Sequence, residues 1–141
     1  DKHETHVATA VKAIAALRLL KLEEQPEKVY GCEVWRNLDW LNDDEKVYLD
    51  CSQYPNLGRA LSSVFDSQIS GGKRYDLAAE GRRLSNATFL ESHACDTYTG
   101  LNYAMDLTPL IKDKTLNVSE YVCGYIDRFN ENVKAMIGKL Q

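Results

Sequence analysis

The chain has 141 residues, of which 44% are apolar and 27% charged, and its formal net charge is −4. This composition is sufficient for one folded domain with an apolar core, and it excludes an intrinsically disordered chain. The net negative charge gives no reason to expect a nucleic acid or an anionic membrane as partner, and no apolar stretch is long enough to predict a membrane span.

The cysteines and the start of the chain bear on the cellular compartment. Cys32, Cys51, Cys95 and Cys123 are widely spaced and form neither a CxxC pair nor a metal-ligand spacing. We therefore expect four reduced, mostly buried thiols instead of a disulfide framework. Because the first residues are not typical of a signal peptide, the sequence predicts a cytoplasmic protein.

The first predicted element is a helix over 5–24, which Pro26 ends. Val7, Val11 and Ile14 recur at helical spacing, and alanine and leucine fill most of the remaining positions. Because this helix is apolar on most sides, we expect it to pack against neighbours on more than one side.

Two strands and two helices are predicted in the middle of the chain. Residues 28–35 and 46–51 are rich in β-branched and aromatic residues, which favour strands. An apolar stripe over 55–69 predicts a helix, and Gly71-Gly72 ends it. A further helix is predicted over 75–90, where the apolar stripe is weaker.

The last part of the chain contains one ambiguous segment and one long helix. Residues 98–107 fit either a strand or a loop, and Thr108-Pro109 stops the segment. A helix is predicted over 118–140, and we interpret its apolar stripe as core packing; a short coiled coil is the alternative and would need more heptads. The stripe consists of Val118, Val122, Tyr125, Phe129 and Met136. With about four helices and two or three strands, the sequence predicts either a helix-rich α+β unit or a fold some of whose strands are missing from the chain as given.

Two histidines, His3 and His6, stand at the start of the first predicted helix, three positions apart, so both imidazoles are expected on one side of it. The spacing is one residue shorter than that of the HExxH zinc-protease motif. A catalytic zinc site takes three protein ligands and an open position, and the remaining histidine, His93, has no neighbour at a ligand spacing. On spacing alone, two surface histidines are favoured over a metal site.

A resemblance gives the histidine pair a further meaning. The stretch HETHVATAVKAI resembles the second signature of the PIG-L/LmbE-like family of zinc-dependent sugar N-deacetylases, in which His-Pro-Asp-His precedes a helix rich in small residues. The order of later segments is similar too, because VYGCEVW, VYLDCSQY, RALSSVFDSQ and GRRLSNATF resemble successive parts of that family. The resemblance covers residues 2–107; Ser67 and Gln68 match the helix motif of the family, whereas Asp66 departs from it.

This resemblance implies an α/β fold that is the C-terminal portion of a Rossmann-like three-layer LmbE/PIG-L fold. In it, His6 would be a zinc ligand and His3 the catalytic histidine that assists the tetrahedral transition state. The other zinc ligands belong to a first signature, Ala-His-Pro-Asp-Asp, which this sequence lacks, so they are expected outside this chain. Glu4-Thr5 stands where the family has Pro-Asp, which removes a carboxylate beside the zinc ligand. We accordingly expect residues 1–141 to be a single, incomplete domain with a C-terminal helical extension over 107–141.

The function implied is that of part of a metal-dependent hydrolase removing acetyl from an N-acetylglucosamine-type sugar. Three alternatives stay open: a catalytically silent relative of the fold, a helical interaction module without metal, and the C-terminal domain of a glucosamine-6-phosphate deaminase-like protein serving assembly or sugar binding. The last rests on the likeness of DSQISGGKRYDLAAEGRRLSNATFLESH to the tail of long bacterial proteins. We also expect exposed apolar surface, and hence association with the upstream part of the protein or a homo-oligomer.

Two other groups of residues receive less weight. Glu33, Trp35 and Arg36 follow a predicted strand, where packing against the stem of the arginine is the favoured interpretation. Gly71-Gly72-Lys73-Arg74 lacks the spacing of a P-loop, so a loop that ends a helix is favoured over phosphate binding.

Overall fold

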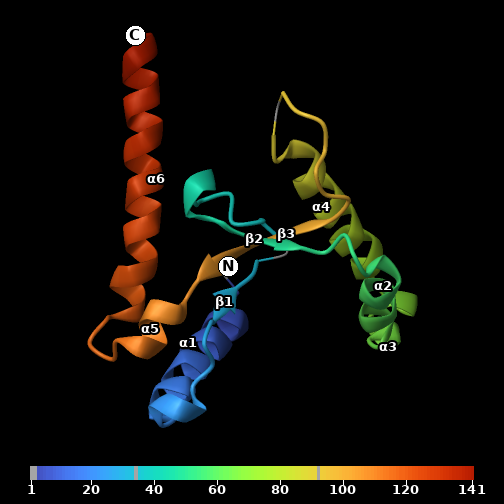
Figure 1. Cartoon of the computed structure of the whole chain (residues 1–141), viewed down its shortest axis with the longest axis horizontal. Coiled ribbons are helices and arrows are strands. Elements are labelled where there is room, and N and C mark those ends of the chain that lie inside the picture. Colours follow the sequence, from blue (N-terminus) through green and yellow to red (C-terminus); the bar gives the residue numbers. More distant parts are fainter. Residues whose placement is uncertain (1–2, 34, 92) are drawn as a thin grey trace. The chain divides into compact units, whose positions relative to one another are not determined.

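The computed structural model describes residues 3–33, 35–91 and 93–141 (Figure 1). These residues form a helix-rich α/β fold with a small three-stranded antiparallel sheet, which confirms the predicted class at this level. The chain divides into two compact units. The first unit is Asp1–Val47 with Ala104–Gln141, and the second unit is Tyr48–Tyr103. No helix among the described residues is long and apolar enough to cross a membrane.

The sheet has the strand order β1-β3-β2, where β1 is Tyr30–Gly31, β2 is Val47–Asp50 and β3 is Leu101–Asp106. Strands β1 and β3 are antiparallel, with Tyr30 opposite Asp106 and Gly31 opposite Met105. The predicted strand over 46–51 is thus confirmed, and the ambiguous segment 98–107 contains a strand. Of the described residues in 28–35, only the two of β1 are in a strand, because left-handed turn residues follow closely at Asn37 and Leu38.

The core of the first unit lies where α1 (Glu4–Leu19) packs against α5 (Thr108–Lys112). Ile14, Leu110 and Ile111 are buried together there, and the beginning of α6 (Val118–Leu140) packs against them. The long predicted helix over 118–140 is confirmed, whereas α5 was not predicted. Its Thr108-Pro109 start was expected only to stop a segment, but proline is well suited to the first turn of a helix.

The guanidinium of Arg18 links α1 to the chain that follows α5. Its Nε donates a hydrogen bond to the carbonyl oxygen of Leu110 at 2.5 Å, and its Nη2 donates to that of Leu116 at 2.7 Å. The carbonyl of Leu110 lies at the end of a helix and that of Leu116 in a turn, so they lack hydrogen-bond partners within a helix. The arginine supplies the donors for both. The expected helix over 5–24 ends already at Leu19, and a short 3-10 turn, Leu22–Glu24, follows it.

The described residues of the second unit form three helices. They are α2 (Pro55–Ser63), α3 (Asp66–Ser70) and α4 (Tyr75–Phe89), and α4 packs against both of the others. The prediction of one helix over 55–69 is wrong, because Val64 and Phe65 interrupt it. Just before the interruption, two serine hydroxyls bond back to carbonyls four residues earlier, a contact that weakens and bends helices.

One asparagine holds α4 against the β3 end of the second unit. Asn86 is only 4% exposed, and its Nδ2 donates to the carbonyl oxygen of Leu101 at 3.0 Å. The hydroxyl of Tyr103 donates in turn to the backbone carbonyl of Asn86 at 3.2 Å. Because a buried amide must be hydrogen-bonded, these contacts fix α4 relative to this strand end.

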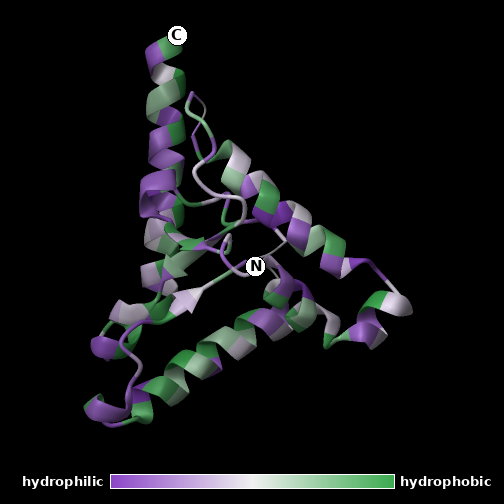
Figure 2. Cartoon of the chain, turned by 45° about the vertical axis from the view of Figure 1, so that its right-hand side comes forward, coloured by the Kyte–Doolittle hydropathy of each residue, from purple (hydrophilic) through white to green (hydrophobic). Residues whose placement is uncertain are grey.

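Several expectations about burial are wrong. Three of the four thiols are exposed, those of Cys32, Cys95 and Cys123, because they lie in loops and on an outward side of α6 rather than in the core. In α1, only Ile14 is buried, so this apolar helix packs on one side instead of several. Apolar residues recur along the helices in Figure 2, and many large ones are exposed, which confirms the expectation of exposed apolar surface.

Candidate functional site

The structure brings His3 and His6 together at the beginning of α1. Their rings are stacked, with 4.6 Å between ring centroids and 28° between ring planes, and both residues are exposed. His3 is the N-cap residue, and its carbonyl oxygen accepts from the backbone N–H of Val7 at 3.0 Å. The first helical turn therefore sets the backbone of both histidines, and the expectation that both imidazoles lie on one side of the helix is confirmed.

The histidine pair has a limited set of metal-binding neighbours. Among the described residues, no three side chains of histidine, cysteine, aspartate or glutamate are grouped so that they could hold a metal ion. Glu4, which follows His3 directly, is exposed in the first turn of α1. His93 is exposed in the second unit, in the loop after α4. The pair is thus a place where two imidazoles meet solvent and could contribute two ligands to a site, and the described residues group no third ligand of these types with them.

The weaker candidates have structural roles. Glu33 is buried, and its Oε2 accepts a hydrogen bond from the indole Nε1 of Trp40 at 2.9 Å, so its carboxylate helps to hold the loop that follows β1. Trp35 and Arg36 are exposed in that loop. The favoured packing of the arginine stem against this tryptophan stays a prediction.

A basic and an acidic side chain pair with each other at the turn between α3 and α4. Gly71 and Gly72 end α3, and the guanidinium of Arg74 donates to both carboxylate oxygens of Asp76 at 2.9 and 2.7 Å. This hydrogen-bonded contact raises the pKa of Arg74 and lowers that of Asp76. The loop interpretation of the Gly71–Arg74 stretch is confirmed, because α3 ends at Ser70 and α4 begins at Tyr75.

The segments that carry the family resemblance lie on several elements. RALSSVFDSQ spans the second half of α2, the interruption after it and the first turn of α3, and GRRLSNATF forms the second half of α4.

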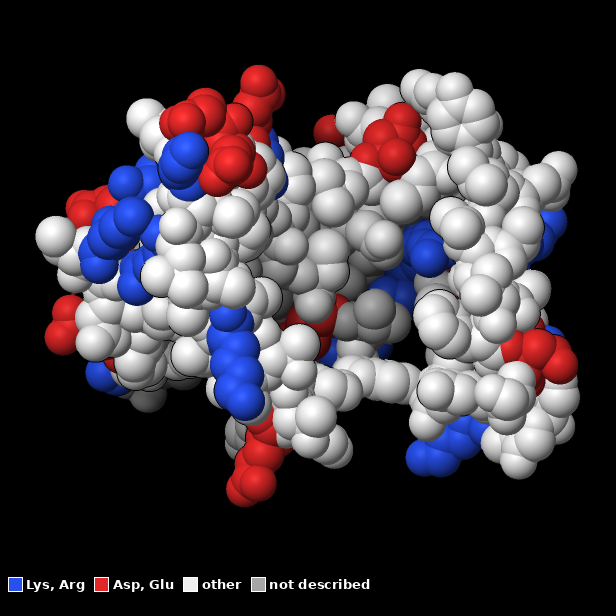
Figure 3. All heavy atoms as spheres, turned by 90° about the horizontal axis from the view of Figure 1, so that it is seen from below, with Lys and Arg blue, Asp and Glu red and all other residues white. Residues whose placement is uncertain are grey.

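Lysine, arginine, aspartate and glutamate side chains are interspersed on the face shown in Figure 3. A single-sign charged patch that would attract a highly charged ligand does not dominate this face.

A cluster on α6 was not predicted from the sequence. The hydroxyl of Tyr121 donates to the backbone carbonyl of Asp106 at 2.8 Å and lies 3.1 Å from that of Tyr125. The guanidinium of Arg128 lies 4.3 Å from the centroid of the Tyr125 ring and pairs with the carboxylate of Glu45. Burial, together with the Tyr125 contact, raises the pKa of Tyr121 far above its usual value. The cluster thus fixes the first half of α6 rather than forming a reactive site.

Comparison of the chain with models of known families, with curated proteins and with solved structures gave no match. Fold and site together define a helix-rich α/β protein with an exposed pair of stacked histidines at the start of its first helix. Membership of the PIG-L/LmbE-like family stays a prediction from the sequence motifs.

Proposed function

We propose that this chain is the C-terminal portion of a PIG-L/LmbE-like hydrolase, which removes the acetyl group from an N-acetylglucosamine-type sugar. The observation that carries the proposal is the stacked pair of imidazoles at the beginning of α1, 4.6 Å apart between centroids. His6 is the proposed zinc ligand, and His3 is the proposed group beside the reacting carbonyl. The many small residues in the helix that follows support the same assignment.

Zinc fits this chain only as a shared ion. A zinc centre for catalysis needs three protein ligands, and the described residues offer no group of three. We expect His6 alone not to retain a zinc ion, so the proposal requires ligands from a segment or a chain beyond these residues. When bound, the zinc would supply Lewis-acid polarisation of the acetamide carbonyl.

The proposed task of His3 follows from its position. Its imidazole is exposed beside His6, so it can reach a substrate that is bound next to His6. In amide hydrolysis, the carbonyl oxygen becomes negative as the carbon becomes tetrahedral. An N–H of His3 that donates to this oxygen stabilises the charge, and the same ring can hold a proton for the leaving amine.

The test is release of acetate from N-acetylglucosamine derivatives by the natural protein, measured together with its zinc content. His6→Ala is expected to lose both zinc and activity, whereas His3→Ala is expected to keep zinc and lose activity by about 10²- to 10³-fold. His93→Ala is the matched control, because it removes an exposed histidine of the second unit and is expected to change neither quantity. Equal acetate release by the wild type and His6→Ala would refute the proposal.

A second candidate is a domain of the same fold, or a helical module, that serves assembly without a metal. The observation that favours it is the exposed apolar surface of the helices, including Val7 and Val11 of α1 and Leu57 and Leu61 of α2. Zinc titration of the natural protein separates the two candidates. Stoichiometric zinc that His6→Ala abolishes supports the hydrolase, and the absence of binding at micromolar zinc supports the assembly domain.

A further inference from the structure

The two halves of α6 differ in how the first unit holds them. The N-terminal half is fixed by the hydrogen bond from Tyr121 to Asp106 and by the ion pair between Arg128 and Glu45. Beyond Arg128 the helix extends away from the rest of the first unit (Figure 1). A helical end that projects into solvent is expected to be polar, and this one is not.

The projecting half exposes large apolar side chains. Met136 is 63% exposed, Ile137 52% and Leu140 85%. The expectation that the whole apolar stripe of this helix packs in the core is therefore wrong for its C-terminal half. The reason is geometric, because the elements of the first unit that meet α6 do so near its N-terminal end.

The exposed residues continue one seam along the helix. Apolar residues recur at alternating spacings of four and three, which is the a/d pattern of a coiled coil over nearly three heptads. Positions d are Val122, Phe129 and Met136, and positions a are Ile126, Val133 and Leu140. We call these six residues the α6 seam. Val122 and Phe129 are half-buried, whereas Ile126 and the last three residues of the seam are exposed, so the seam runs from the fixed half of the helix into the projecting half.

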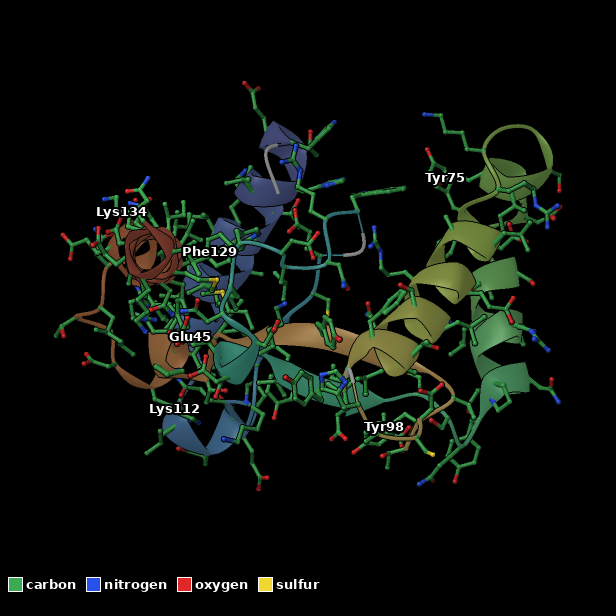
Figure 4. The ribbon with its side chains drawn as sticks, turned by 90° about the horizontal axis from the view of Figure 1, so that it is seen from above. Glu45, Tyr75, Tyr98, Lys112, Phe129 and Lys134 are labelled. Carbon is green, nitrogen blue, oxygen red and sulfur yellow. The ribbon has the colours of Figure 1, made fainter. Side chains whose placement is uncertain are left out.

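The charges of α6 lie off the seam. Glu131 and Lys134 occupy outer positions and pair with each other at 2.8 Å, and Phe129 and Lys134 lie on different sides of the helix in Figure 4. Apart from Lys139 in the last turn, the positions that flank the seam carry neutral residues. Charges at the flanking positions normally select the partner of a coiled coil. Here they neither repel an identical helix nor favour a helix of different sequence.

We propose that the α6 seam pairs with the same seam of a second copy of this chain, as a parallel two-stranded coiled coil. Ile126 and Val133 are β-branched residues at a positions, which favours two parallel strands. In register, the exposed half of one helix covers the exposed half of the other. The seam spans about 27 Å at 1.5 Å per residue, so the interface is small and the dimer is expected to dissociate on dilution. It does not depend on the histidine pair.

The test is sedimentation equilibrium of the full chain over a range of micromolar concentrations. Met136→Lys places a charge on the seam, and Ala135→Lys is the matched control, because it adds the same charge at an exposed neighbour off the seam. The wild type and the control are expected to reach twice the chain mass of 16.0 kDa, whereas Met136→Lys stays monomeric with an unchanged circular dichroism spectrum. A monomeric wild type, a dimer of Met136→Lys or an assembly of more than two copies would overturn the proposal.

The orientation has its own test. Leu140→Cys, made in a chain whose four native cysteines are changed to serine, is expected to form a disulfide with the Leu140→Cys of the second copy under mild oxidation. Only a parallel pair in register places these two positions within reach. If the dimer forms without this disulfide, the parallel arrangement is wrong.

Discussion

Replacing Arg18 tests how the first unit is held together. Its guanidinium makes two short hydrogen bonds, to the carbonyls of Leu110 and Leu116, from a partly buried position between α1 and the turn after α5. Arg18→Met keeps most of the apolar stem and removes both donors. Arg18→Lys keeps the charge but has a single nitrogen, which cannot reproduce the fork of the guanidinium.

The expected losses follow from these contacts. A hydrogen bond that involves a charged group contributes about 1.5–3 kcal/mol, and partial exposure lowers that value. Arg18→Met is therefore expected to lower the free energy of unfolding by roughly 2–4 kcal/mol, and Arg18→Lys by about half as much. The alkyl stem contributes little to the difference, because methionine retains it.

The assay is urea unfolding at neutral pH, followed by tryptophan fluorescence. Both tryptophans, Trp35 and Trp40, belong to the first unit, so the signal reports this unit. Lys12→Met is the matched control, because it removes a cation from an exposed position of the same helix and is expected to change stability by about 0.5 kcal/mol or less. The reasoning is refuted if Arg18→Lys is as stable as the wild type, or if Arg18→Met costs no more than Lys12→Met.

Three further predictions concern single positions. Leu38 is 3% exposed and has a φ of 55°, so Leu38→Ala is expected to lower the free energy of unfolding by about 2–5 kcal/mol. Leu38→Gly, which relieves the left-handed backbone, is expected to be at least as stable as Leu38→Ala. A glycine variant less stable than the alanine variant in the same unfolding assay would contradict this. A Cβ added to Gly81 in α4 meets nothing within 4 Å, so Gly81→Ala is expected to stabilise the second unit by about 0.5–1 kcal/mol. The measurement is urea unfolding followed by circular dichroism, in which the midpoint should rise; a lower midpoint would be inconsistent with an open site. Hydrogen bonds from the hydroxyl and the amide of Thr115 lower the pKa of Asp113, so their stabilising effect is present at neutral pH and is lost as the pH falls below about 4. Thr115→Val should raise the pKa of that carboxyl in an NMR titration, and an unchanged midpoint would exclude the hydroxyl as the cause.

The sequence predicts those elements that rest on local signals. The helix Val118–Leu140 was predicted at both ends from its apolar periodicity. The structure adds the reason for its start, because the side chain of Asn117 accepts hydrogen bonds from two backbone amides of the first turn. Strand β2 and helix α4 were predicted in the same way, from residue type and periodicity. The placement of His3 and His6 on one side of the helix was predicted from their spacing, whereas the stacking of their rings was not, because His3 is the N-cap and lies just outside the helix.

Contacts between distant residues could not be predicted. Arg18 reaches carbonyls more than ninety positions away, and nothing in the residues near it in the sequence indicates those partners. The burial of Asn86 depends on the β3 end, fifteen positions further on. Exposed apolar surface was expected in general, but the helices that carry it could not be named, because periodicity shows which side of a helix is apolar but not whether another element covers it.

The histidine pair and the apolar side of α1 give one prediction that joins both proposed functions. Val7 and Val11 are 44% and 45% exposed and follow His3 at spacings of four, so they lie on the same side of the helix as its imidazole. A segment that covers these valines borders the histidines as well. If that segment supplies the missing zinc ligands, Val11→Asp in the natural protein is expected to lower zinc content as strongly as His6→Ala, although residue 11 is no ligand. Lys12→Asp, an exposed change on the next position, should leave zinc in place. If Val11→Asp disrupts assembly while zinc was never bound, the apolar side serves association alone, and the histidines are surface residues beside an interface.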